Sequence, residues 1–228
     1  MRALCRAGRV AVPGVPARRG ARPRRTDRRV RWCRLALVGA LWLAGCASTP
    51  QTHFHTLLPA EPLAPAAGVV PGGGPRILLE TIRVPAAVDQ PQWLVRLPDE
   101  TLVQLEQDRW ASALPDELSS ALLEVLRSRF GIVDARAPGA GPAQWRIRVD
   151  IGRFESRLGL ALMEARWSVT AAGSATAALG CSTAYREPAE PGMPALSAAH
   201  RRIVVRLGEA IGEALLALQA GKTTHCPG

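Results

Sequence analysis

The sequence has few aromatic residues, which make up only 4% of the chain, and this scarcity argues against a surface that stacks on nucleic-acid bases or sugar rings. The signatures of common catalytic and phosphate-binding sites are also missing, since no GxSxG, HExxH, Walker A or GxGxxG element occurs. The histidines that a hydrolase could use lie in no recognisable motif: His53, His55, His200 and His225. We therefore expect a non-catalytic protein without a cofactor.

The formal net charge of +10 would suggest a nucleic-acid-binding protein, but the distribution of the charges argues against one. Residues 1–34 contain twelve arginines and one aspartate, so this segment alone carries +11. From Cys46 onward there are 17 basic and 18 acidic residues, which gives 17 − 18 = −1. This larger part of the chain is nearly neutral, and no nucleic-acid partner is indicated.

Long hydrophobic runs are missing as well. The apolar run Leu35–Ala44 has ten residues, whereas a membrane-spanning helix needs roughly 20. Arginines precede this run and the residues Leu43–Cys46 (LAGC) end it, an arrangement typical of a bacterial lipoprotein signal peptide. We predict that residues 1–45 are removed, that Cys46 carries a diacylglycerol and an N-acyl chain, and that residues 46–51 form a short tether. An uncleaved anchor and a plain secretory signal with an incidental cysteine are the alternatives.

The residues around this signal also indicate a location. Lipoproteins retained in the inner membrane usually have an aspartate after the lipidated cysteine, whereas this chain has Ala47. We therefore expect a lipid anchor in the inner leaflet of the outer membrane of a Gram-negative bacterium, with the domain facing the periplasm. Residues 1–29 are rich in arginine, alanine, glycine and proline and are longer than a normal positively charged signal segment. We hypothesise a misassigned start, with translation beginning near Val30.

Cysteine is scarce in the exported part of the chain. Cys5 and Cys33 precede the predicted cleavage site, so only Cys181 and Cys226 remain beside Cys46. The periplasm is oxidising, and we expect a disulfide that ties the tail, residues 221–228, to the strand around Cys181. A buried thiol and a loose tail thiol are the alternative. Neither cysteine belongs to a CxxC or Cys/His cluster, so no metal site is indicated.

The first half of the exported chain alternates between short strands and turns. Residues 52–58 are predicted to form a strand, and residues 59–75 form a Pro/Gly-rich loop. A second strand is expected over residues 76–84, where Pro85 ends it. Residues 92–97 and 101–107 flank a Pro-Asp-Glu turn and predict a hairpin.

The second half combines two helices with three alternating strands. Proline and two acids at residues 115–117, leucines at helical spacing and Gly131 predict an amphipathic helix from Pro115 to about Phe130. Apolar and polar residues alternate over three segments, 144–154, 161–169 and 176–185. Residues 196–219 predict a closing helix. We expect residues 52–220 to form a single α/β two-layer domain, with a mostly antiparallel sheet and both amphipathic helices packed on one face.

His53 and His55 project to the same side of the first predicted strand. Two such imidazoles could ligate a metal ion. An exposed strand beside the membrane anchor is the other interpretation, and we favour it because none of the histidines lies in a recognisable motif.

Five segments of the chain carry a family resemblance: His53–Pro59, Ile82–Pro85, Asp89–Arg96, Arg109–Ala111 with Leu114, and Ala165–Ser168. In these segments the chain resembles the PqiC-like family of ABC-type transport auxiliary lipoprotein components, also described as membrane integrity-associated transporter subunits. His55 stands where the family usually has an aromatic residue, and Gln90 where an arginine is common.

The resemblance implies an auxiliary or docking subunit of a lipid transport system that maintains envelope integrity. The implied partner is an MCE-domain, PqiB-like transporter subunit. Some family members form rings, so a homo-oligomeric ring is a further expectation. A protein of another class is the alternative, namely a monomeric periplasmic carrier or chaperone that binds an acyl chain in its own cavity.

Two residues on the predicted hairpin are candidate partner contacts. Trp93 and Arg96 are of the residue types most frequent at interface hot spots, so they could project into the partner. The alternative, which we call the structural interpretation, is that the residues of these segments stabilise the fold and do not contact a partner. In that case Pro85 breaks a strand, Trp110 packs in the core at the start of a helix, and Arg96 pairs locally.

Overall fold

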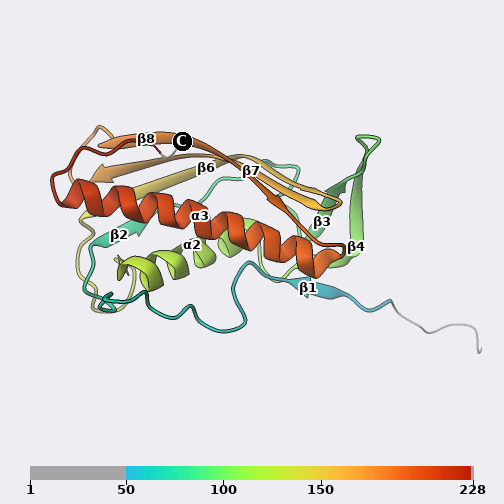
Figure 1. The fold of residues 1–228 in the computed structure, drawn as a ribbon, viewed down its shortest axis with the longest axis horizontal. Helices are drawn as coiled ribbons and strands as arrows, with labels where there is room; N and C mark the ends of the chain where they lie inside the picture. The colour runs from blue at the N-terminus through green and yellow to red at the C-terminus, as the bar shows by residue number, and fades with distance from the viewer. Residues whose placement is uncertain (1–49, 227–228) are drawn as a thin grey trace, which may run out of the picture. The chain divides into compact units, whose positions relative to one another are not determined.

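The computed structural model describes residues 50–226. Cys46 and the predicted signal peptide lie outside the described residues. Within the described range, eight strands form one sheet (Figure 1). The sheet is built around β6 (Trp145–Arg157), which pairs antiparallel with β7 (Leu160–Ala171) along its length, and β7 pairs antiparallel with β8 (Leu179–Pro188). The predicted three-stranded meander is thus confirmed.

Apolar alternation explains these three strands. Ile147, Val149 and Ile151 are buried on β6, and Ala165 and Trp167 are buried at the paired positions of β7. Successive side chains of a strand point to opposite faces, so the residues between them face away from the core. The result is one apolar and one polar face.

The other edge of β6 is shared by two short parallel strands. β2 (Arg76–Leu79) pairs with the beginning of β6, and β3 (Gln92–Arg96) pairs with its end. Between them, Arg83 forms a parallel bridge with Asp150. The prediction of a mostly antiparallel sheet is therefore wrong, because the sheet is mixed. Apolar alternation identifies the buried face of a strand, but it carries no information about the direction of its neighbour.

The remaining three strands continue the sheet beyond β3 and beyond β2. β4 (Leu102–Trp110) pairs antiparallel with β3 and completes the predicted hairpin, and β1 (His53–His55) lies parallel to β4. β5 (Val133–Asp134), which the sequence pattern does not predict, lies parallel to β2. The strand predicted over residues 76–84 is shorter than expected, because the chain leaves β6 after Glu80 and returns only at Arg83.

Both helices of the described range cover the same face of the sheet (Figure 1). α2 (Leu114–Phe130) ends at Gly131, which has a left-handed backbone with φ 65° and donates its N–H to the carbonyl of Arg127. α3 (Met193–Gln219) begins three residues earlier than expected from the apolar pattern. The prediction of two helices on one face agrees with this arrangement, and the described residues form an α/β domain.

The two helices approach closely at glycines of α3. A Cβ atom added at Gly208 would lie 2.7 Å from Cγ1 of Val125, and one added at Gly212 would overlap the ring of Phe130. Real Cβ atoms do not come so close to their neighbours, because close-packed interiors leave no room for an added methyl group. Glycine at these two positions therefore allows α3 to pack as close to α2 as it does.

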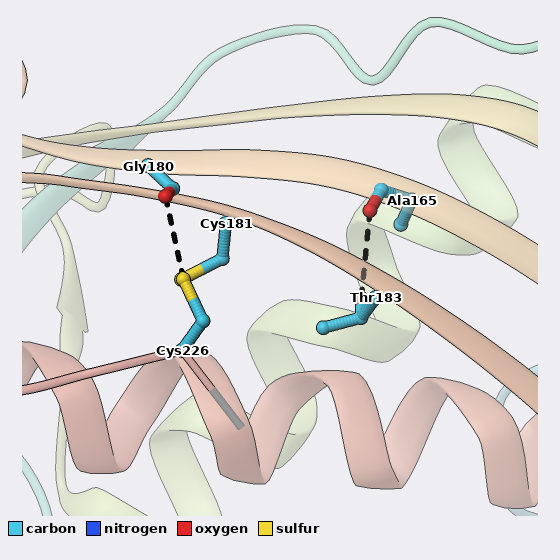
Figure 2. The surroundings of a disulfide bond; sticks show 5 residues. All are labelled: Ala165, Gly180, Cys181, Thr183 and Cys226. Atoms are coloured by element: carbon cyan, nitrogen blue, oxygen red, sulfur yellow. Dashed lines mark hydrogen bonds between the residues drawn. A yellow bond between two sulfur atoms is a disulfide. The ribbon is translucent and has the colours of Figure 1, made fainter. Parts of the chain in front are cut away.

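A disulfide fastens the C-terminal tail to β8. Cys226 is bonded to Cys181, with the two Cα atoms 5.4 Å apart (Figure 2). The Sγ atom of Cys226 also lies 3.3 Å from the carbonyl oxygen of Gly180. The bond closes a loop that contains the whole of α3, so it restrains the unfolded chain across this helix.

The buried carboxylate of Glu117 joins β1 to the start of α2. Its Oε2 accepts hydrogen bonds from the Thr56 hydroxyl at 2.6 Å and the Leu57 N–H at 2.9 Å. Its Oε1 accepts from the N–H and the hydroxyl of Ser112 at 3.1 and 2.8 Å. All four partners are donors, and a carboxylate offers only acceptor atoms, so Glu117 satisfies each of them with a side chain that is itself only 4% exposed.

We predict that Glu117→Gln lowers the free energy of unfolding by about 2 kcal/mol, because the amide nitrogen would face donors and leave buried groups unpaired. Urea denaturation followed by circular dichroism measures the change. The matched control is Asp116→Asn, the neighbouring exposed acid in the same helical turn, for which we expect a loss of about 0.5 kcal/mol or less. Equal losses for the two variants would contradict this role for Glu117.

Candidate functional site

Three segments that are distant in the sequence meet around one surface pocket of about 380 Å³, which we call the motif pocket. Phe54 comes from β1, Asp89–Pro91 from the loop before β3, and Arg109–Ala113 from the end of β4 and the start of α2. These are parts of the segments that resemble the PqiC-like family. The structure therefore brings separate pieces of the resemblance to one place on the surface.

Backbone hydrogen bonds hold the walls of the motif pocket together. The N–H of Trp110 donates to the carbonyl of Pro91 at 2.9 Å, and the N–H of Ala111 donates to the carbonyl of His55 at 2.8 Å. Trp110 is also the parallel partner of His55 in the sheet. Because these bonds involve only the main chain, the walls keep their positions whichever side chains line them.

Trp110 is the one buried residue in the lining of the motif pocket and is only 4% exposed. Its ring stacks on Trp93 with centroids 4.1 Å apart and meets the edge of Phe154 at 5.9 Å. Such offset-stacked and edge-to-face pairs stabilise a core beyond the area that they bury. The pocket thus rests on the aromatic part of the core.

A buried chain of polar groups continues from Trp93 into α3. The indole N–H of Trp93 donates to Oγ of Ser156 at 2.7 Å, and this Oγ lies 2.8 Å from Nε2 of His200. The imidazole of His200 stacks on Phe154 with ring centroids 4.1 Å apart. Strands β3 and β6 and helix α3 are therefore joined through one group of side chains.

Ser156 and His200 resemble the first two members of a hydrolase triad, but their surroundings do not suit catalysis. Both side chains are buried, with residue exposures of 2% and 1%. Burial lowers the pKa of His200 to about 3, which makes its imidazole a very weak base near neutral pH. Nδ1 of His200 has no hydrogen-bond partner among residues 50–226, so no carboxylate orients the ring.

Trp93 does not project from the hairpin. Its side chain is 1% exposed and lies in the core between His55, Trp110 and the polar chain. The hypothesis that Trp93 contacts a partner directly is therefore wrong, because the alternation along β3 turns Trp93 and Val95 inward together. Trp110 is buried at the start of α2, as the structural interpretation expects.

Arg96 lies on the opposite side of β3 and is occupied by local partners. Its Nη1 donates to the carbonyl of Glu100 at 3.0 Å, and its Nε lies 3.3 Å from Oε1 of Glu155. Burial alone would raise the pKa of Glu155, but hydrogen bonds from Arg157 and Arg153 outweigh it and lower that pKa. Glu155 thus stays ionised among three arginines, and Arg96 belongs to this network.

The histidines of β1 share one acid. Nε2 of His55 lies 2.7 Å from Oδ1 of Asp108, and Nδ1 of His53 lies 3.9 Å from the same oxygen. A metal site needs a third ligand in a suitable position. In the described part of the chain, no group of three or more histidine, cysteine, aspartate or glutamate residues has an arrangement that could hold a metal ion.

Within residues 50–226, neither helix combines the length and the apolar character that a membrane crossing requires.

We predict that the protein loses stability below about pH 6.5 because of His200. The unfolded chain takes up a proton on this residue near the ordinary pKa of 6.5, whereas the folded protein takes it up only near a pKa of about 3. Stability is therefore complete above the unfolded pKa and falls as the pH drops towards about 3. Between about pH 7.5 and about pH 5 we expect this residue to account for a loss of about 2 kcal/mol.

Urea denaturation at both pH values tests this effect, with His200→Gln as the comparison, because glutamine can still hydrogen bond to Ser156. The variant should show a smaller loss of stability between the two pH values. An identical loss in both proteins would refute the role of His200.

Solved structures resemble this domain in fold. A crystal structure described as an uncharacterized protein matches 72% of this chain and 99% of its own, with a TM-score of 0.59 and 18% identity. The crystal structure of a DUF330 protein from Xanthomonas campestris matches 75% of this chain and 98% of its own, with a TM-score of 0.59 and 16% identity. At these identities the likeness establishes the fold. The comparison with curated proteins found no match.

A family model identifies the family to which this chain belongs. The model described as "ABC-type transport auxiliary lipoprotein component" matches residues 55–212. The matched range runs from the last residue of β1 through most of α3. It includes the aromatic core and every lining residue of the motif pocket except Phe54. Because the match spans more than half of the chain, this protein belongs to the ABC-type transport auxiliary lipoprotein family, the PqiC-like family that its motifs resemble.

Proposed function

We propose that this protein is a non-catalytic docking subunit of an MCE-type lipid transport system, anchored in the inner leaflet of the outer membrane by acyl chains on Cys46. The family is a transport auxiliary component and not an enzyme family. The LAGC motif at the end of the apolar run supports the anchor. In this role the protein joins its transporter to the membrane and contributes to envelope integrity.

The observation that carries the proposal is the motif pocket. Its lining residues Phe54, Asp89, Pro91 and Ala111 are exposed, whereas the residues beneath it are part of the core. An exposed depression with rigid walls and a buried aromatic residue in its lining suits the capture of a partner side chain. Opposite charges at Asp89 and Arg109 on its rim would orient that partner.

The alternative function is a monomeric carrier of an acyl chain. A different pocket, of about 410 Å³, supports it, since Leu123, Ile132 and Val133 give this pocket an apolar lining between α2 and β5. Native mass spectrometry separates the two functions. A lipid that co-purifies beyond the covalent acyl chains favours the carrier, and a lipid-free complex with an MCE-domain protein favours the docking subunit.

We expect Cys46→Ser to release the protein from the outer membrane, because several acyl chains on one cysteine give stable anchoring that the folded domain alone does not supply. Intact-mass measurement and density-gradient fractionation of membranes test this expectation. The matched control is Cys226→Ser, which removes a cysteine but not the predicted lipid site. Recovery of Cys46→Ser in the acylated outer-membrane fraction would show that the anchor lies elsewhere.

We expect Ala111→Arg to weaken co-purification of the MCE-domain partner at least tenfold, corresponding to about 1.4 kcal/mol, because the long side chain would fill the motif pocket. Ala111 is exposed, so the substitution leaves the core intact. Ala67→Arg is the matched control, an exposed alanine in the loop 59–75. Quantitative pulldown from solubilised membranes measures both variants, and equal recovery of the partner would rule out docking at this pocket.

A further inference from the structure

Large exposed apolar side chains are concentrated at one end of the domain. Of the six such side chains in residues 50–226, four lie on β1, at the start of β4 and in the β6–β7 turn, and we call them the anchor-side apolar face: Phe54 (66% exposed), Leu102 (51%), Val103 (37%) and Leu158 (68%). The other two, Val70 and Leu216, line a pocket at the far end of α2 and α3.

Leu102, Val103 and Leu158 are neighbours in the sheet, because Arg96 pairs with both Leu102 and Arg157. Phe54 lies beside Arg109, further along β4. A group of exposed apolar side chains marks an interaction surface.

The elements that carry this face are held together. β1 pairs with β4, and β3 pairs with β6 at Ser156 and Arg157. The turn of the β3–β4 hairpin is joined to the β6–β7 turn, since Nη1 of Arg157 lies 3.2 Å from Oε1 of Glu100. In Figure 1 the hairpin, the β6–β7 turn and β1 lie at the same end of the domain.

The chain also enters the domain from this end. β1 runs parallel to β4, with His53 beside Asp108, so the residues before His53 lie towards the hairpin turn from which β4 begins. Cys46 precedes His53 by seven residues, and such a segment reaches at most about 25 Å when fully extended. The 27 residues of α3, which run between the two ends, measure about 40 Å. A lipid on Cys46 therefore brings the anchor-side end closer to the bilayer than the opposite end.

Leu158 is 68% exposed, and the charged groups near it form ion pairs with one another. Arg157 pairs with Glu100 and Glu155, and Arg153 pairs with Glu155 and Glu164. A basic patch that would bind anionic lipids by charge alone is thus missing from this part of the described structure. This part of the domain can therefore contact a bilayer only by inserting apolar side chains at the level of the headgroups.

We infer that the anchor-side apolar face rests on the lipid bilayer, with the side chains of Leu102, Val103 and Leu158 among the headgroups, the acids of the hairpin turn in water, and α3 leading away from the membrane. The inference relies on the acylation of Cys46 in the proposed function and adds an orientation to it. Phe54 belongs both to this face and to the motif pocket. The pocket therefore lies on the half of the domain that faces the membrane in this orientation, and its partner is engaged there.

An environment-sensitive fluorophore at two matched positions tests the orientation. Leu158→Cys and Val70→Cys place the label at side chains that are 68% and 70% exposed, at opposite ends of the domain. The full-length acylated protein is reconstituted in vesicles of phosphatidylethanolamine and phosphatidylglycerol, with and without spin-labelled lipid. Intact mass first confirms acylation and the Cys181–Cys226 bond, so a negative result would count against the orientation and not against the anchor.

We expect the label at residue 158 to shift to shorter wavelength and to be quenched several-fold more by spin-labelled lipid than the label at residue 70. Equal quenching at the two positions would overturn the inference. A second measurement uses the acyl-free Cys46→Ser protein, labelled at residue 158, and records the emission wavelength of the label without vesicles. A label already shielded in that sample would show that another protein copy covers the face, which would also overturn the inference.

Discussion

Burial of the Trp93 indole is the constraint on which much of this domain depends. A buried indole N–H needs an acceptor, because an unpaired donor in the core costs about 1–3 kcal/mol. Oγ of Ser156 is that acceptor at 2.7 Å, and Ser156 in turn lies against His200 of α3. The position of β3 along β6 and the position of α3 over the sheet are therefore determined by the same short chain of hydrogen bonds.

The stacking of Trp110 on Trp93 extends this constraint to the surface. Trp110 ends β4 and immediately precedes the chain that leads into α2, so its ring fixes where the strand stops and the helix begins. Glu117 then accepts hydrogen bonds both from Ser112 and from Thr56 and Leu57, the residues after β1. The exposed residues of the motif pocket occupy the positions between these buried anchors, which explains why a family resemblance made of short segments produces one continuous site.

Local patterns in the sequence were sufficient to predict most elements and their buried faces, since alternation identifies β6 and β7 and a leucine stripe with a terminal glycine identifies α2. They could not predict that β2 and β3 lie parallel to β6, because pairing direction depends on contacts between distant segments. They also could not reveal that Ser156 and His200 meet, or that Gly208 and Gly212 permit the close approach of α3 to α2. The hypothesis that Trp93 contacts a partner rests on its residue type alone, whereas the alternation along its own strand places it with Val95 on the buried face.

The distribution of charge and burial suits a protein whose position is set by its anchor. The chain from Cys46 onward has a formal charge of only 17 − 18 = −1, and Arg96, Arg153 and Arg157 are neutralised locally by Glu155 and its neighbours. Long-range attraction to anionic lipids is therefore weak, and salt would change it little. In such a molecule orientation depends on short-range contacts near the tether, where exposed apolar side chains and the motif pocket lie together. In the proposed orientation the same end of the domain meets both the bilayer and the partner, and the hydrogen-bonded core beneath it holds that end in place.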